Sequence, residues 1–369
     1  MIPVLWLCGP PGVGKTCVAW RVYTHLREGG VAAAYVDIDQ LGMCYPERDS
    51  DSGRYRLKAR NLASVVANFA AFGATCVVVS GVVDPSYRPA VPGAAATLCR
   101  LRVDRDELVR RFPGRSGGGG PVAGVVASAE ELDAGTIADL CVDTTGLAMP
   151  EAVAAVEAAT EGWRTAAGAP PPLPVFVPTD GQVLWVSGVP GVGTSTVGYA
   201  IYERTLRSGR TTGYLDLRQI GFGARGQVDH QLRAANAAAV WRAYRDLGAD
   251  GLVIVGGIDA HGAEAHYARA LPAATPAVCR LHANRADLAD RILPRGERGS
   301  WPQPGDPLLG LPVERLRQVV ERAVADGGEL ELAETGVRVD SSGLGVAETA
   351  DAVLATGVWP LLESGQGQK

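Results

Sequence analysis

Two parts of this 369-residue chain repeat the same pattern, and that repeat restricts the fold more than any other feature. The segment VLWLCGPPGVGKT at residues 4–16 recurs as VLWVSGVPGVGTS at residues 183–195, with eight of 13 positions identical. Four further segments recur in the same order, so we call residues 4–147 the first repeat and residues 183–344 the second repeat. This recurrence predicts two tandem domains with one fold, in line with a prior of ~150 residues per domain.

A proline-rich segment separates the two repeats. Residues 168–181 read GAPPPLPVFVPTDG, and their five prolines predict a stiff, extended linker. We therefore expect a first domain over residues 1–167, the linker over 168–181, a second domain over 182–362 and a frayed tail over 363–369.

Short apolar runs in the first repeat alternate with segments of helical periodicity. Strands that are apolar throughout and separated by helices indicate an α/β fold, with a parallel sheet covered by helices on both faces. The strands are expected at residues 4–8, 32–37, 75–80, 96–102 and 140–143, and helices at 15–27, across 62–72, at 106–112 and at 150–161.

Composition excludes several classes of partner. The net charge of −5 and the pI of about 5.6 provide no basic field for a polyanion, so nucleic acid is not expected as a partner. No apolar run reaches the ~18 residues of a membrane helix, so no membrane partner is expected. The seven cysteines form no CxxC pair, and the N-terminus lacks the charged front of a signal peptide; both features predict a cytoplasmic protein with reduced thiols. The oligomeric state stays open, a homodimer included.

Residues 9–16, GPPGVGKT, fit the phosphate-binding pattern GxxxxGK[ST] and lie between a strand and a helix, as that mechanism requires. The glycines let backbone N–H groups converge on a phosphate, and the helix N-terminus favours an anion. We expect the Lys15 ammonium to bridge the β- and γ-phosphates and the Thr16 hydroxyl to bind Mg²⁺. The predicted nucleotide-binding residues are Gly9, Pro10, Pro11, Gly12, Val13, Gly14, Lys15, Thr16 and Cys17.

Two carboxylates end the second expected strand. Asp37 and Asp39 stand at positions i and i+2, which on a strand point to the same face, and they lie at the edge where open α/β sheets bind ligands. We expect Asp37 to join Thr16 in holding Mg²⁺ and Asp39 to accept the proton of an attacking hydroxyl.

With these motifs, the first repeat resembles the shikimate kinase and gluconate kinase group of P-loop kinases. The resemblance also rests on SGVVDPSYR at residues 80–88, on LRVDRDEL at 101–108 with the arginines that follow it, and on VDTT at 142–145. It covers about the first 160 residues. It implies a five-stranded sheet of order 2-3-1-4-5 in each P-loop NTPase domain, ATP with Mg²⁺, and a small hydroxylated substrate as phosphoryl acceptor. The implied catalytic residues are Lys15, Asp37, Asp39, Arg111 and Arg115, the two arginines serving as lid residues.

The acceptor is expected beside the basic run GRYRLKARN at residues 53–61. If this run is helical, Arg56 and Arg60 lie together; if it is extended, Arg54, Arg56 and Lys58 share one side. Four consecutive glycines inside residues 116–124 fit a mobile lid at this position, and an idle surface loop fits nearly as well. The predicted substrate-binding residues are Asp39, Arg56, Lys58, Arg60, Ser80, Gly81 and Arg88.

The second repeat keeps the glycines of the phosphate-binding loop but loses its charged side chains. Thr194 replaces Lys15, and Arg218 replaces Asp39. Because strand patterns survive while these positions change, we expect a retained fold without catalysis, that is, a pseudo-kinase domain. The other replacements in the second repeat are Asp290 for Arg110, and Asp229, Gln231 and Ala235 for Arg54, Arg56 and Arg60.

Three functions fit this pattern. The first is an ATP-dependent kinase of a small hydroxylated molecule. The second is a nucleotide-binding regulatory ATPase whose second domain recognises a partner, and the third is a nucleotide kinase. Phosphoryl transfer that requires an added acceptor would separate the kinases from slow hydrolysis alone.

Overall fold

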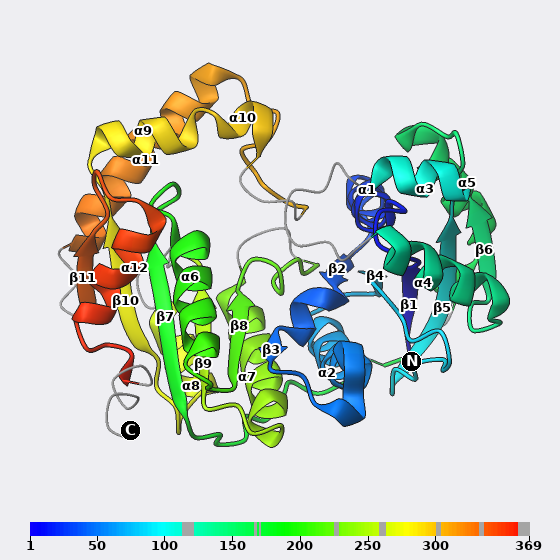
Figure 1. Cartoon of the computed structure of the whole chain (residues 1–369), viewed down its shortest axis with the longest axis horizontal. Helices are drawn as coiled ribbons and strands as arrows, with labels where there is room; N and C mark the ends of the chain where they lie inside the picture. The colour runs from blue at the N-terminus through cyan, green and yellow to red at the C-terminus, as the bar shows by residue number, and fades with distance from the viewer. Residues whose placement is uncertain are drawn as a thin grey trace. The chain divides into compact units, whose positions relative to one another are not determined.

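The computed structural model describes residues 1–112, 122–165, 168–169, 171–224, 229–257, 263–299, 304–331 and 336–360 (Figure 1). Within these ranges the chain forms two α/β units, each built around one sheet. Among the described helices, none is both long and apolar enough to cross a membrane.

The first sheet is parallel and has five strands in the order β2-β4-β1-β5-β6. Counted along the chain within this unit, that order is 2-3-1-4-5, so the order expected for the first domain is confirmed. The strands are β1 (Ile2–Cys8), β2 (Ala33–Asp37), β4 (Cys76–Ser80), β5 (Ala94–Arg102) and β6 (Leu140–Asp143). The helices are α1 (Lys15–Glu28), α2 (Tyr55–Ala71), α3 (Arg105–Arg111), α4 (Val122–Ala134) and α5 (Met149–Ala159), with 3-10 turns η1 (Ile38–Gly42), η2 (Asp49–Arg54) and η3 (Trp163–Thr165).

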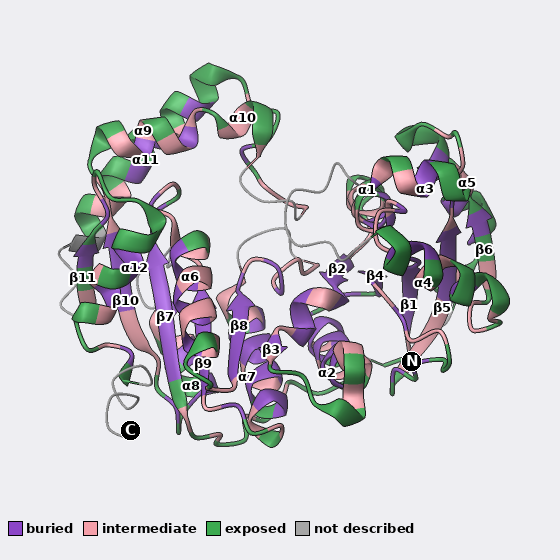
Figure 2. Ribbon diagram, viewed as in Figure 1, coloured by how far each residue is buried: buried purple, intermediate pink, exposed green. Residues whose placement is uncertain are grey.

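In the first sheet, β1, β2 and β4 are buried on both faces (Figure 2). On β1, Leu5 and Leu7 join a core cluster with Val18 of α1 and Val153 of α5. Strand neighbours point to opposite faces, and Trp6, between the two leucines, is only 1% exposed. Burial on both sides explains why these strands read as continuous apolar runs in the sequence.

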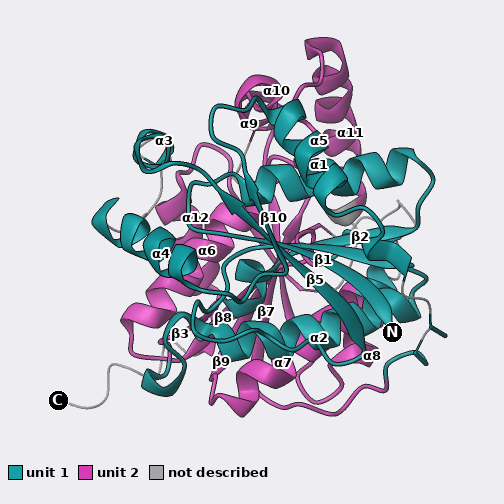
Figure 3. Ribbon diagram, turned by 90° about the vertical axis from the view of Figure 1, so that its right-hand side faces the viewer, with its two compact units in different colours: residues 1–42, 48–174, 221–232 teal, residues 43–47, 175–220, 233–369 magenta. Residues whose placement is uncertain are grey.

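The two compact units are not contiguous in the chain (Figure 3). The first unit contains residues 1–42, 48–174 and 221–232, and the second contains residues 43–47, 175–220 and 233–369. Each unit therefore includes a short segment that follows the second strand of the other repeat.

The second sheet has six strands in the order β11-β10-β7-β9-β8-β3. The five strands of the second repeat are parallel and, read from the opposite edge, follow the order of the first sheet. The expectation of five strands in this sheet is wrong by one, because β3 comes from the first repeat and pairs antiparallel with β8. The strands are β3 (Cys44–Tyr45), β7 (Gln182–Gly188), β8 (Thr212–Asp216), β9 (Gly251–Val255), β10 (Ala277–His282) and β11 (Val337–Asp340).

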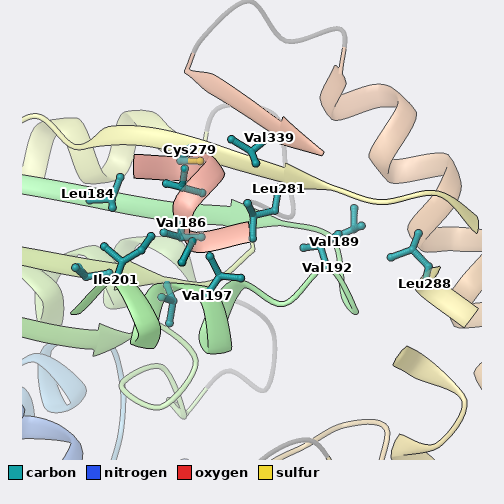
Figure 4. Packing of buried hydrophobic residues seen from close by; sticks show 14 of the residues in the cluster. Leu184, Val186, Val189, Val192, Val197, Ile201, Cys279, Leu281, Leu288 and Val339 are labelled. Carbon is teal, nitrogen blue, oxygen red and sulfur yellow. The ribbon is translucent and has the colours of Figure 1, made fainter. Parts of the chain in front are cut away.

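The second unit has its own hydrophobic core (Figure 4). Leu184 and Val186 of β7 pack with Val197 and Ile201 of α6, and Cys279 of β10 lies in the same cluster. The helices of this unit are α6 (Thr194–Arg207), α7 (His230–Asp246), α8 (Ala263–Ala270), α9 (Arg285–Ile292), α10 (Arg295–Arg298), α11 (Val313–Glu331) and α12 (Val346–Ala355).

Candidate active site

The phosphate-binding loop lies between β1 and α1, at the carboxyl end of the central strand. A side chain at Gly9 would bring its Cβ within 2.7 Å of the Leu101 carbonyl oxygen, so the loop can only start on glycine. Gly14, with a φ of 97°, directly precedes the first residue of α1. The first backbone N–H groups of the helix therefore face the loop, as an anion site requires.

The two polar side chains at the start of α1 already have partners. Lys15 is 5% exposed, and its ammonium donates to the Pro10 carbonyl oxygen at 3.3 Å. The Thr16 hydroxyl donates to the Asp37 carboxylate at 3.1 Å, which brings together the two residues predicted to bind Mg²⁺. Cys17 follows on α1 with an exposed thiol.

Asp37 is buried at the end of β2 and held from several sides. Its Oδ2 accepts the Ser80 hydroxyl at 2.9 Å as well as the Thr16 hydroxyl, and its Oδ1 accepts the Asp39 backbone N–H at 2.9 Å. Because Ser80 uses its one hydrogen on Asp37, the Tyr35 hydroxyl, 2.9 Å away, donates to Ser80. Tyr35 is 0% exposed, so a buried chain of three side chains fixes this carboxylate.

Burial, and next the negative charge of Asp39, raise the pKa of Asp37 to about 6. Hydrogen bonds and Lys15 act in the opposite direction and are outweighed. A carboxylate held in this state gains from a cation placed beside it, because an opposite charge favours the ionised form.

Asp39 does not lie on a strand. β2 ends at Asp37, and Asp39 belongs to the 3-10 turn η1, so the expected strand alternation is not what brings the two carboxylates together. The turn is fixed from α2, where the Asn61 side chain donates to the Leu41 carbonyl oxygen at 2.7 Å. Sequence reasoning missed Asn61, although its recurrence as Asn236 in the second repeat could have identified it.

The basic run is α-helical from Tyr55 onward, and its Lys58 side chain reaches Asp39. Lys58 is buried on α2 and donates to Asp39 Oδ1 at 2.8 Å. Arg56 and Arg60 are exposed on the same helix. Burial alone would raise the pKa of Asp39, but the ammonium groups of Lys58 and Lys15 outweigh it and lower that pKa below its ordinary value. Asp39 keeps 43% of its side chain exposed, so an ionised carboxylate reaches solvent beside the phosphate-binding loop.

Two predicted substrate residues stand at the end of β4, where they support the site from within. Ser80 is 0% exposed and spends its hydroxyl on Asp37, so it positions that carboxylate and does not meet an acceptor. The Gly81 N–H donates to the Leu7 carbonyl oxygen at 3.2 Å, and a Cβ there would collide with Ile38.

Arg88 is not brought to this site. Its guanidinium forms a bidentate pair with Asp139 at 2.8 Å for both contacts, and it also donates to the Ala96 carbonyl oxygen at 3.1 Å. Ala96 lies opposite Val4 in the sheet, four residues before β1 reaches Cys8, and Asp139 directly precedes β6. Arg88 therefore ties together the beginnings of strands, away from the end where the loop lies.

Arg111 lies in the last turn of α3, as expected, and its guanidinium donates to the Val13 carbonyl oxygen of the loop at 3.3 Å. It also forms an ion pair with buried Glu107, which accepts the Gly146 N–H at 2.8 Å. Arg115 and the four consecutive glycines lie outside the described residues.

The oxygen donors at Thr16 and Asp37 fit a magnesium ion carried by a nucleotide. Mg²⁺ in such sites takes one or two protein oxygens and completes its coordination with phosphates and water. Among the described residues, no group of three or more His, Cys, Asp or Glu side chains that could hold a metal ion occurs.

The second unit repeats the backbone of this site with different side chains. The Ser195 hydroxyl donates to Asp216 at 3.2 Å, and the Arg218 N–H donates to the same carboxylate at 2.9 Å, matching the contacts of Asp37. Thr194 begins α6 where Lys15 begins α1. Val255 stands at the position of Ser80, so the hydroxyl that braces Asp37 has no counterpart.

No protein-family model matches this chain, and no curated protein does. Several solved structures are similar to about half of it. The tunicamycin resistance protein of Deinococcus radiodurans shares 18% identity at a TM-score of 0.35, over 44% of this chain and 96% of that chain. Shikimate kinase from Bacteroides thetaiotaomicron shares 19% identity at a TM-score of 0.33, over 44% of this chain and 99% of that chain. A gluconokinase from Sinorhizobium meliloti shares 18% identity at a TM-score of 0.31, over 51% and 96% respectively.

Proposed function

We propose that this chain is an ATP-dependent kinase that transfers the γ-phosphate to a hydroxyl of a small molecule. In this proposal the two units arose by tandem duplication: the first unit catalyses the transfer, and the second is a pseudo-kinase. The observation that carries the proposal is the difference between two neighbouring carboxylates beside a complete phosphate-binding loop. Asp37 is buried and contacts Thr16, whereas Asp39 is half-exposed.

The nucleotide half of the proposal rests on the loop and on Asp37. Lys15 and the N–H groups at the start of α1 supply positive charge for the phosphates. Thr16 and Asp37 lie in hydrogen-bond contact, so their oxygens converge where Mg²⁺ would join the nucleotide. Mg²⁺ when bound would neutralise charge on the transferring phosphoryl group.

The acceptor half rests on Asp39. Its carboxylate is half-exposed, ionised and oriented by Lys58, two residues from the proposed metal ligand. An ionised acid in this place can accept the proton of a hydroxyl as that oxygen attacks phosphorus. The exposed Arg56 and Arg60 on α2 remain the proposed acceptor contacts, with Lys58 acting through Asp39.

The degenerate role of the second unit rests on chemistry and not on shape. Thr194 cannot supply the positive charge of Lys15, and Arg218 cannot accept a proton in place of Asp39. The matching loop therefore keeps a backbone able to face an anion without the groups that transfer phosphate.

The experiment is a screen of ADP release from Mg²⁺-ATP against sugars, polyols, nucleosides and hydroxylated antibiotics. We expect release that depends on one class of acceptor, with a phosphorylated product identified by mass spectrometry. Hydrolysis at the same rate with and without every acceptor would instead favour the nucleotide-dependent regulator, and a nucleoside monophosphate as the active acceptor would favour a nucleotide kinase.

A further inference from the structure

In each unit, the second strand of one repeat is hydrogen-bonded by a residue from the other repeat. In the first unit, the Tyr35 N–H of β2 donates to the Phe222 carbonyl oxygen at 2.9 Å. In the second unit, the Tyr214 N–H of β8 donates to the Met43 carbonyl oxygen at 2.8 Å. Tyr35 and Tyr214 are matched positions of the repeat, and so are Met43 and Phe222. The same hydrogen bond thus occurs twice, with the roles of the repeats interchanged.

The exchanged residues also enter the cores. Phe222 packs against the core of the first unit, with its ring centroid 4.8 Å from that of Trp20 and 5.9 Å from that of Tyr35. Met43 and Tyr45 pack against the core of the second unit. An exposed strand favours unwanted pairing, and here β2 and β8 each pair antiparallel with residues from the other repeat.

In the first unit this contact leads to the active site. Phe222 touches Tyr35 through both its backbone and its ring. The Tyr35 hydroxyl bonds Ser80, and Ser80 donates to Asp37. Phe222 therefore lies at the outer end of the buried chain of side chains that fixes the proposed metal carboxylate.

Among the described residues of the second unit, no equivalent chain of side chains links the tyrosine hydroxyl to the carboxylate. Val255 replaces Ser80, and the Tyr214 hydroxyl donates instead to the Ser195 backbone carbonyl at 3.2 Å. The backbone hydrogen bond between the repeats is the same in both units. In the first unit, the contact continues through the side chains of Tyr35 and Ser80 to the Asp37 carboxylate.

We propose that Phe222, a residue of the second repeat, is a positioning residue for the Asp37 carboxylate of the first unit. The second repeat then has a role that does not depend on the replacement of Lys15 and Asp39 by Thr194 and Arg218. It supplies the residue that pairs with β2, the strand that carries Asp37. The inference rests on the nucleotide-binding half of the proposed function. It also states that Phe222 fixes β2 and η1 in the protein without nucleotide.

The first measurement is amide hydrogen exchange of the full chain without nucleotide. Phe222→Ala removes the ring that packs on Tyr35, so exchange should speed up across residues 33–42, which comprise β2 and η1. Val156→Ala is the matched control, because Val156 is 0% exposed in the same core but lies on α5. We expect amide exchange across residues 33–42 to be slower in the control than in Phe222→Ala when the two variants lose the same melting temperature.

The second measurement is the affinity for a non-hydrolysable ATP analogue with and without Mg²⁺. Phe222→Ala should weaken the Mg²⁺-dependent part about tenfold, and Phe222→Tyr, which keeps the ring, should restore it. Ser80→Ala breaks the chain of side chains, so adding Phe222→Ala to it should cost less than about twofold more.

Each outcome decides one statement. The role of Phe222 would be overturned if the losses of Mg²⁺-dependent affinity in Ser80→Ala and Phe222→Ala multiplied in the double variant. It would also be overturned if hydrogen exchange across residues 33–42 were the same in Phe222→Ala and Val156→Ala. If the unaltered chain bound no nucleotide, the proposed function would fail, and the exchange measurement alone would still decide whether Phe222 fixes the strand that carries Asp37.

Discussion

The two phosphate-binding loops of this chain share a backbone and differ in charge. Gly9 and Gly14 have φ values of 146° and 97°, and their counterparts Gly188 and Gly193 have 152° and 94°. Lys15 in one loop is Thr194 in the other. The comparison teaches that glycines and apolar strands are sufficient to keep the loop folded, because the backbone angles agree although Thr194 replaces Lys15.

The largest effect should separate Lys15 from Thr194. Lys15→Ala removes the charge aimed at the transferring phosphoryl group and should lower turnover about 10³-fold. Thr194→Ala should leave turnover unchanged, because no phosphoryl transfer is assigned to that loop. Steady-state ADP release with the identified acceptor measures both. Comparable losses in the two variants would mean that both units are active.

The next effect concerns the acid that the second unit lacks. Asp39→Asn should lower turnover about 10²-fold while leaving nucleotide affinity nearly unchanged, because its proposed partner is the acceptor hydroxyl. Asp37→Asn should weaken Mg²⁺-dependent nucleotide binding as well. The split between turnover and affinity is the readout; normal turnover in Asp39→Asn would remove this residue from the mechanism.

A smaller effect should distinguish the two arginines that contact the loops. Arg111 donates to the Val13 carbonyl oxygen, and Arg291 donates to the matched Val192 carbonyl oxygen at 3.4 Å. The shared contact is a property of the fold, so both Ala variants should lower the melting temperature. Only Arg111→Ala should also lower turnover, about tenfold, if its guanidinium meets phosphate. Turnover equal to that of Arg291→Ala would leave Arg111 a purely structural residue.

The smallest effect concerns Arg88, which the sequence associates with the acceptor and the structure associates with Asp139. Burial would raise the pKa of Asp139, but the Arg88 guanidinium and the Leu98 N–H outweigh it and lower that pKa below its ordinary value. Both side chains are more than 40% exposed, so Arg88→Ala should cost only about 0.5–1 kcal/mol of unfolding free energy, with turnover unchanged.

The pH dependence follows from the direction of that shift. Because the pKa is lower in the folded state, the stabilisation is complete above the ordinary value of 3.8 and is lost as the pH falls through the folded value. Urea unfolding of Asp139→Asn and the unaltered chain should therefore differ at pH 7 and converge below pH 3.8. A difference that persists unchanged in acid would point to packing instead of charge.

The sequence predicted what depends on neighbours along the chain. The loop at residues 9–16 and the order of the first sheet follow from local patterns, because each strand is an apolar run and each helix has a period. The pairing of Lys58 with Asp39 could not be predicted, since it depends on where α2 meets η1. Likewise, a two-residue strand such as β3 has no periodicity, and its partner β8 lies in the other repeat.

The same limit explains why the sequence assigns Arg88 and Ser80 to the acceptor. Arg88 belongs to the segment 80–88, on which the resemblance to the kinase group partly rests. Its partner Asp139 is 51 residues away in the sequence and holds Arg88 at the beginnings of the strands. Ser80 has the position of a substrate residue and the burial of a core residue, and burial depends on Tyr35 and Asp37, which approach from β2.

The central claim is that one of the two loops is a working nucleotide site, and calorimetric titration with a non-hydrolysable ATP analogue and Mg²⁺ tests it most directly. The account predicts a stoichiometry of one nucleotide per chain. Binding should be lost in Lys15→Ala, because charge-assisted hydrogen bonds contribute about 1.5–3 kcal/mol each, and should persist in Thr194→Ala. Two equivalent sites per chain, or binding that survives Lys15→Ala and disappears in Thr194→Ala, would contradict it.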